Sequence, residues 1–195
     1  MAEHFNLSDG VRAQRKLMLT FVQWGGTWGG TDPNADDATY TSGNTALLGA
    51  RTEDSSIEFN LDAETTTDIL GYTYTDINKT EPQQDFDPFY IIGGTGGAAK
   101  LAQYLTKAAL ANRITDYDSQ FNVIIVTAYI DNNSSGAGLK YYAVRHRNCS
   151  IYPTSMGGDS YVSLPIEVHL SNRICEGTAS GLTETELGFT PNGSL

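Results

Sequence analysis

The chain has 195 residues, of which 39% are hydrophobic and only 18% are charged, and it contains 20 Gly and 11 Tyr. This length suffices to bury a core, and the composition is typical of a β-rich domain with many turns, which excludes a chain that is disordered throughout. A formal net charge of −11 excludes a protein that holds nucleic acid by neutralising its phosphates.

The first residues show no charged leader followed by a long apolar run, and no apolar stretch approaches the length of a membrane span. We therefore expect synthesis in a cytoplasm and no membrane partner. Cys149 and Cys175 are the two cysteines. They are too few for a disulfide scaffold, so we expect reduced thiols.

The N-terminal part of the chain predicts two strands separated by a long exposed loop. In Arg15–Gln23, apolar and polar residues alternate as they would in a half-buried strand, and strand character returns at Thr45–Arg51. The stretch 24–44 between them is rich in Gly and Asp and reads as an excursion into solvent.

This loop contains two motifs that require interpretation. Trp24 and Trp28 stand among glycines and fit either a sugar-stacking loop or the anchors of a subunit interface. The alternation of Asp32, Asn34 and Asp36 resembles the start of a calcium loop. The Gly and Glu that an EF-hand needs are missing further on, so we reject an EF-hand and leave open a weaker cation site or a solvated acidic loop.

The most regular alternation of the chain lies in Ser56–Glu64 and predicts a strand with one core face and one anionic face. The expected core face contains Ile57, Phe59 and Leu61, and the opposite face contains Glu58, Asn60, Asp62 and Glu64. The following stretch 65–89 is rich in Thr, Tyr and Asp and reads as an extended hairpin or arm.

One convincing helix is predicted, Ala98–Asn112, with a stripe that includes Leu101 and Leu105. Phe121–Ile130 is apolar on both faces and predicts a central strand that is covered on both sides. Strands are also expected at Leu139–Tyr152 and Tyr161–Leu170.

These elements predict a mainly β fold, a β-sandwich or partly open barrel with one flanking α-helix, because strands and helices do not alternate. We expect one domain over residues 1–175, with extended loops at about 24–44 and 65–89. Residues 176–195 are expected to form a polar arm that is disordered or ordered only by a partner. The expected core residues are Ile57, Phe59, Leu101, Leu105, Val123, Ile125, Leu164, Ile166 and Val168.

No pattern of residues selects a catalytic site or a cofactor. Gly94–Ala99 fits a dinucleotide fingerprint formally, but Asp116 and Asp118 come before the next predicted strand and not after it, so a flexible strand-to-helix hinge explains these glycines better. The three histidines accompany neither a nucleophile elbow nor a zinc-binding helix. We therefore expect a protein that is not an enzyme and that binds no metal and no cofactor.

Five segments resemble the tail tube, or major tail, proteins of long-tailed bacteriophages. They are Leu47–Asn60 (LLGARTEDSSIEFN), Thr65–Gly71 (TTTDILG), Asn78–Gln84 (NKTEPQQ), Ile151–Gly158 (IYPTSMGG) and Leu164–Leu170 (LPIEVHL). The resemblance implies a β-sandwich with one helix, six copies of which form a ring whose inner strands join into a continuous barrel. Stacked rings would form the tube that conducts the genome out of the virion.

The resemblance also implies the partners: other copies of the chain, the tape measure and tail terminator proteins, and double-stranded DNA that passes without tight binding. A carbohydrate-binding module of a virion and the tube protein of a phage-derived contractile particle are the alternatives. Residues expected at contacts between subunits or rings are Trp24, Trp28, Asp36, Asp37, Tyr72, Tyr74 and Lys79. The anionic face with Glu58, Asn60, Asp62 and Glu64 is interpreted as the wall of the bore or, alternatively, as an outer solvated surface.

Overall fold

A computed structural model of the chain describes residues 18–25, 44–48, 55–91, 93–131, 141–171, 173–180 and 187–192, without the side chains of 78 and 128–131. Its strands are β1 (Met18–Trp24), β2 (Thr45–Leu48), β3 (Ile57–Glu58), β4 (Leu61–Thr67), β5 (Thr73–Thr80), β6 (Gln83–Phe86), β7 (Phe121–Asp131), β8 (Tyr141–Pro153), β9 (Ile166–His169), β10 (Ile174–Ser180) and β11 (Gly188–Pro191). Within these ranges there is one α-helix, α1 (Gly97–Leu110), followed by a short 3-10 helix, η2 (Ile114–Asp116).

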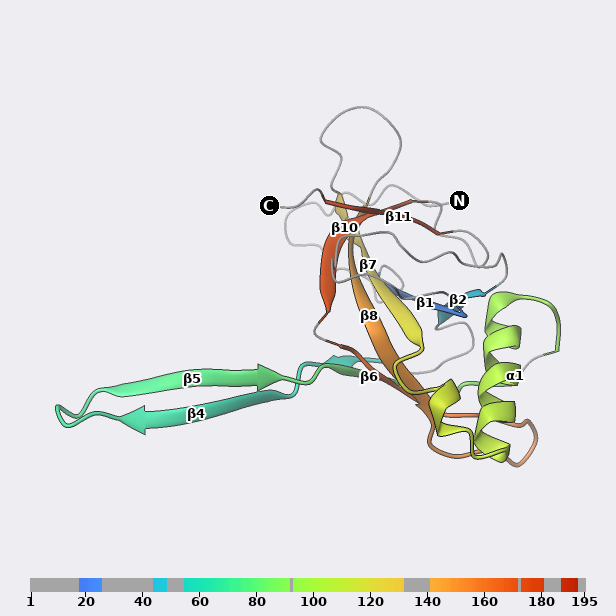
Figure 1. Ribbon diagram of the computed structural model, residues 1–195, viewed down its shortest axis with the longest axis horizontal. Helices are drawn as coiled ribbons and strands as arrows, with labels where there is room; N and C mark the ends of the chain where they lie inside the picture. Colours follow the sequence, from blue (N-terminus) through green and yellow to red (C-terminus); the bar gives the residue numbers. More distant parts are fainter. Residues whose placement is uncertain are drawn as a thin grey trace.

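Nine strands form one antiparallel sheet in the order β2-β1-β7-β8-β9-β6-β3, with β10 paired to β8 and β11 to β10. The long strand β8 curls the sheet: its first part pairs with β7 and β10, whereas its last residues, Ser150–Pro153, pair with β9. The result is a half-barrel with α1 beside it (Figure 1). The predicted mainly β, partly open barrel with one helix is thus confirmed.

The main core fills the space between the sheet and α1, the helix that the sequence predicted at Ala98–Asn112. Leu101 and Leu105 are fully buried there against residues of β1, β7, β8 and β9. A Cβ atom on Gly97 would lie 1.8 Å from the Thr45 carbonyl oxygen, so only glycine lets the helix begin this close to β2. Of the expected core residues, Leu101, Leu105, Val123, Leu164, Ile166 and Val168 are buried, and Ile57 and Ile125 pack against them half-buried.

A second apolar cluster covers the other face of the central strands, and it changes the interpretation of β1. Phe21, Ile124 and Ala179 meet there. Because both faces are covered, every residue from Thr20 to Trp24 is buried, so β1 is not the half-buried strand that its alternation suggested. The polar Thr20 is satisfied inside, where its hydroxyl donates a hydrogen bond to Gln84 Oε1 at 2.9 Å.

Residues 176–180 and 188–191 belong to the sheet, whereas the sequence analysis expected the whole stretch 176–195 to be disordered or ordered only by a partner. Glu176–Ala179 pair with β8, and β11 pairs with β10. The Arg145 guanidinium lies 4.8 Å from the centre of the Phe189 ring, a cation–π contact between β8 and β11. Ala179 is buried in the second cluster, and the half-buried Phe189 packs against it, so β10 and β11 share this cluster with the central strands.

The prediction of one regular strand over Ser56–Glu64 is wrong. β3 is only two residues long, and Asn60 adopts φ +42°, a left-handed conformation that asparagine tolerates better than most residues. The chain turns away from the body there and continues as β4. Phe59 and Leu61 are therefore 64% and 58% exposed and do not face the core.

Candidate assembly interface

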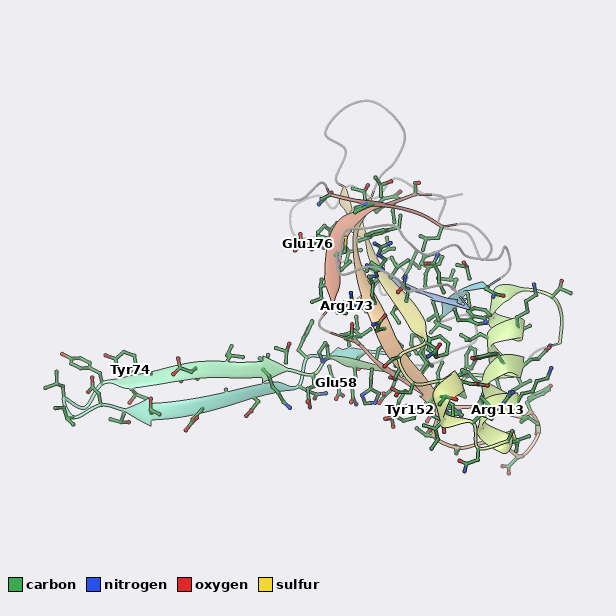
Figure 2. All side chains as sticks on the ribbon, viewed as in Figure 1. Glu58, Tyr74, Arg113, Tyr152, Arg173 and Glu176 are labelled. Carbon is green, nitrogen blue, oxygen red and sulfur yellow. The ribbon has the colours of Figure 1, made fainter. Side chains whose placement is uncertain are left out.

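A two-stranded hairpin formed by β4 and β5 projects from the body of the molecule (Figure 1). The two strands pair with each other from Leu61↔Thr80 to Thr67↔Thr73, with one bulge at Asp62/Ala63. Every residue of β4 is exposed. In Figure 2 the labelled Tyr74 lies at the far end of this hairpin, whereas Arg113 lies at the opposite end of the molecule.

The hairpin exposes many more apolar side chains than a solvated loop needs. The exposed large apolar residues on it are Leu61 (58%), Ile69 (102%), Leu70 (76%), Tyr72 (63%), Tyr74 (55%) and Ile77 (60%). A two-stranded ribbon is marginally stable by itself in water. Concentrated apolar exposure of this kind on a protruding element is typical of a surface that another protein covers.

Two features stabilise the hairpin without help from the body. Threonine pairs face each other across the strands, with the Thr65 and Thr75 hydroxyls 3.3 Å apart and those of Thr67 and Thr73 3.4 Å apart. At the turn, one carboxylate oxygen of Asp68 accepts hydrogen bonds from the backbone N–H groups of Leu70 (2.8 Å) and Tyr72 (2.9 Å). The hairpin therefore has a defined tip.

The root of the hairpin is fixed to the sheet by polar contacts. The Asn60 side-chain amide donates to the Glu81 carbonyl oxygen at 3.1 Å, and the Leu170 N–H donates to the Pro82 carbonyl oxygen at 2.9 Å. Lys79 and Glu81 form an exposed ion pair of 2.6 Å, which raises the pKa of Lys79 and lowers that of Glu81. These contacts set the direction in which the hairpin leaves the body.

A row of carboxylates crosses the outer face of the sheet next to this root. Glu58 on β3, Asp85 on β6 and Glu167 on β9 alternate with inward residues such as Ile57 and Phe86 and belong to neighbouring strands. Asp85 lies directly opposite Glu167 in the register. Burial raises the pKa of Asp85, and the charges of Glu167 and Glu58 raise it further. The face therefore concentrates negative charge.

His169 is the basic group that this row faces. Its Nε2 atom lies 2.6 Å from the Tyr152 hydroxyl and 3.3 Å from Glu167 Oε2, and its ring stacks on that of Tyr152 with 5.0 Å between centres. Burial raises the pKa of Tyr152, and the hydrogen bond to Glu167 adds to this effect. His169, Tyr152 and Glu167 therefore form one hydrogen-bonded network at the surface.

The structure distributes the residues of the expected bore face over two elements. Glu58 lies on β3 in the sheet, Asn60 forms the break, and Asp62 and Glu64 lie on the projecting β4. A single strand does not carry all four. The carboxylates that continue the Glu58 row, Asp85 and Glu167, escaped the sequence analysis because only strand register reveals neighbours on different strands.

The expected interface residues also separate into groups. Tyr72, Tyr74 and Lys79 are exposed on the hairpin or at its end. Trp24 is only 5% exposed and packs in the main core, so it is not a free interface anchor. Trp28, Asp36 and Asp37, together with the Asp32–Asp36 motif, lie outside the described residues.

The strongest apolar exposures, Ile69 and Leu70, were missed by the sequence analysis. The available signal was the pattern Asp68-Ile69-Leu70-Gly71 between two Thr-rich strands, in which Asp and Gly occupy turn positions.

In the described part of the chain, no group of three or more His, Cys, Asp or Glu side chains is arranged to hold a metal ion. No helix among these residues is long and apolar enough to cross a membrane.

No protein-family model matches the sequence, and no curated protein matches it. Among solved structures, the fold is similar to a cryo-EM structure of the anti-feeding prophage cap, the AFP tube terminating cap. The match covers 90% of this chain and 97% of that chain, with 11% sequence identity and a TM-score of 0.42. A likeness of this degree assigns neither a family nor a role to the chain.

Proposed function

We propose that the chain is a structural subunit of a phage tail tube, which assembles into stacked hexameric rings and conducts the genome. Two observations support this proposal: the resemblance of five sequence segments to tail tube proteins and the projecting hairpin. The hairpin is the observation that carries it. The partners in this proposal are other copies of the chain, the tape measure and tail terminator proteins, and DNA in transit.

The energetic argument concerns the six exposed apolar side chains of the hairpin. Full burial of one large aliphatic or aromatic side chain stabilises an interface by about 1.5–3 kcal/mol. In a free subunit these side chains stay in water, whereas in a ring or a stack of rings each subunit buries them against a neighbouring copy. Because the turn and the threonine pairs hold the hairpin in shape, little ordering free energy opposes docking.

The curled sheet supports the same proposal through its edges. β2, β3 and β11 each have a partner on only one side within the described chain. Such edges present unpaired N–H and C=O groups that favour pairing with another chain. Six half-barrels placed around an axis join into a closed wall if neighbouring edges pair, and closure removes the edges.

The bore in this proposal is lined by the face with Glu58, Asp85 and Glu167, which replaces the single-strand face expected from the sequence. Every carboxylate becomes a ring of like charge when the subunit repeats around an axis. DNA carries one negative charge per about 1.7 Å of its axis, so a negative wall disfavours adhesion. A conduit requires a wall of this kind.

Within the described residues, no observation favours the alternative of a carbohydrate-binding module, and Trp28 lies outside them. Trp24 packs in the core and offers no aromatic platform to a sugar.

Electron microscopy and sedimentation of the purified full-length chain over a range of concentrations test the proposed function. Rings or tubes with six subunits per layer support it. A chain that stays monomeric at all concentrations, or that is retained on a glycan column as a monomer, contradicts it.

A further inference from the structure

The tip of the hairpin is a rigid display of two apolar side chains. Ile69 and Leu70 occupy the central positions of the turn, where polar residues are usual, and they are 102% and 76% exposed. Gly71 at φ +85° and the Asp68 carboxylate, which holds two backbone N–H groups, fix the turn. The tip therefore holds two apolar side chains in a fixed position, where they can insert into an apolar groove of another molecule.

A complementary apolar groove lies where α1 ends beside the loop that follows β8. Its volume is about 200 Å³, smaller than the roughly 300–1,000 Å³ of ordinary small-molecule sites, so it suits side chains better than a ligand. Leu110 (71% exposed) and Met156 (47% exposed) border it, and the buried Leu164 contributes to its lining. The groove therefore offers apolar walls that water covers in the free subunit.

The charges around the tip and around the groove are opposite in sign. The hairpin carries Asp62, Glu64, Asp68 and Asp76 against the single Lys79. By contrast, α1 carries Lys100 and, in its last turn, Lys107, and it contains no acidic residue. Arg113 follows the helix, where its guanidinium is paired with Asp116 at 3.1 Å, so within the described residues Lys107 is the unneutralised cation at this end of α1. In a chain of net charge −11, a helix whose charged side chains are both lysines attracts an anionic hairpin, whereas acidic surfaces repel it.

The positions of the two surfaces exclude docking within one chain. The tip and the end of α1 lie at opposite ends of the long axis (Figures 1 and 2). A plug and a socket at opposite ends form a heterologous contact, which repeats from copy to copy until it closes into a ring or continues as a stack.

We infer that Ile69 and Leu70 of one copy insert into the Leu110–Met156 groove of a second copy, with the acidic hairpin lying along the basic end of α1. This inference rests on the proposed function and specifies one of its contacts. It names residues on both sides, so each side is testable separately.

The test mixes two variants with one added cysteine each, Leu70→Cys and Met156→Cys, under mild oxidation and measures cross-linked dimer on a gel. The native thiols interfere little, because both are buried and burial raises the pKa of Cys149 to about 11. The control mixture pairs Leu70→Cys with Glu176→Cys, an exposed position on β10 away from α1. Wild-type chain from the same preparation is imaged in parallel for rings or tubes.

We expect several-fold more dimer from the Leu70/Met156 mixture than from the control mixture and than from either variant alone. Equal yields in both mixtures, with normal wild-type tubes, would overturn the groove assignment and leave the proposed function intact. Equal yields in both mixtures, together with a wild-type chain that forms no rings or tubes, would overturn both. Selective cross-linking without tubes would uphold the contact and refute the tube.

Discussion

Asp85 on β6 and Glu167 on β9 lie directly opposite each other on the outer face of the sheet, so two carboxylates occupy a position where side chains are close neighbours. Directly opposed like charges destabilise an antiparallel pair. The raised pKa of Asp85, caused first by burial and then by Glu167 and Glu58, is the electrostatic sign of this conflict. The negative charge of this face therefore does not stabilise the folded subunit.

The first prediction is that Asp85→Asn stabilises the subunit. We expect a gain in the free energy of unfolding of about 0.2–0.5 kcal/mol at neutral pH, the low part of the range for opposed like charges because solvent screens exposed carboxylates. A folded-state pKa above the ordinary value of 3.8 means that ionisation of Asp85 costs the native state free energy. The gain should therefore shrink as the pH falls through the raised pKa and vanish below 3.8.

Urea denaturation at several pH values measures this gain, and Asp159→Asn, a change of an exposed loop carboxylate, serves as the matched control. A loss of stability in Asp85→Asn at neutral pH, or a gain that grows toward acid, would contradict the like-charge account.

The second prediction compares two leucines of the same helix. Leu105 is fully buried and Leu110 is 71% exposed. Leu105→Asp places an unpaired charge in the main core and should cost roughly 4–5 kcal/mol or more, enough to unfold the subunit. Leu110→Asp should change stability by less than about 0.5 kcal/mol and still weaken assembly, because it puts a charge in the groove.

Circular dichroism during thermal unfolding checks both variants, and sedimentation checks their assembly. If Leu105→Asp folds and assembles normally, the placement of α1 over the core is wrong. If Leu110→Asp assembles at the wild-type concentration, its surface is not part of a contact.

The sequence predicted the parts of the fold that depend on periodicity, and it failed where one residue redirects the chain. The stripe of Leu101 and Leu105 identified α1 because a buried helix must repeat its apolar residues every three or four positions. The alternation from Ile57 to Glu64 looked equally clear, yet Asn60 turns the chain away and places the second half in solvent. Periodicity reports which residues share a face and does not report whether anything covers that face.

The candidate interface was predictable only in outline for a similar reason. The Thr- and Tyr-rich composition identified 65–89 as an arm, and Tyr72 and Tyr74 are exposed on it. Trp24, by contrast, is the last residue of β1, and its side chain packs in the main core. The glycines that follow it made it look like part of the exposed loop. Pairing across strands, such as that of Asp85 with Glu167, depends on long-range register that a single sequence leaves open.

The third prediction concerns the tip. The double change Ile69→Ser and Leu70→Ser removes two exposed apolar side chains without adding charge, so stability should stay within about 0.5 kcal/mol of the wild type. The concentration at which assembly begins should rise at least roughly tenfold, since a loss of 1.4 kcal/mol per contact suffices for that factor.

Light scattering against concentration measures this threshold. Ile174→Ser, a change of a 46% exposed residue on β10, is the control for apolar exposure in general. An unchanged threshold in the double variant would exclude the tip as an assembly contact.

The last prediction concerns the bore and uses Asp85→Lys together with Glu167→Lys. In assembled tubes this exchange turns rings of negative charge into rings of positive charge at the narrow place where DNA would pass. A basic wall binds DNA by releasing counterions, and the affinity falls steeply as salt rises. We therefore expect wild-type tubes to retain no DNA and the double variant to retain it at low salt and release it at high salt.

Filter binding of duplex DNA to purified tubes over a salt series measures the retention, with Asp159→Lys and Glu176→Lys, two exposed carboxylates outside the hairpin, as the matched control of equal charge change. If the face with Glu58, Asp85 and Glu167 is the outer surface of the tube, exposed lysines there still bind DNA, so retention alone does not separate the two faces. Linear and circular duplexes do, because only a free end can enter a bore. Preference of the Asp85/Glu167 variant for linear DNA places this face inside, and equal retention of both forms places it outside.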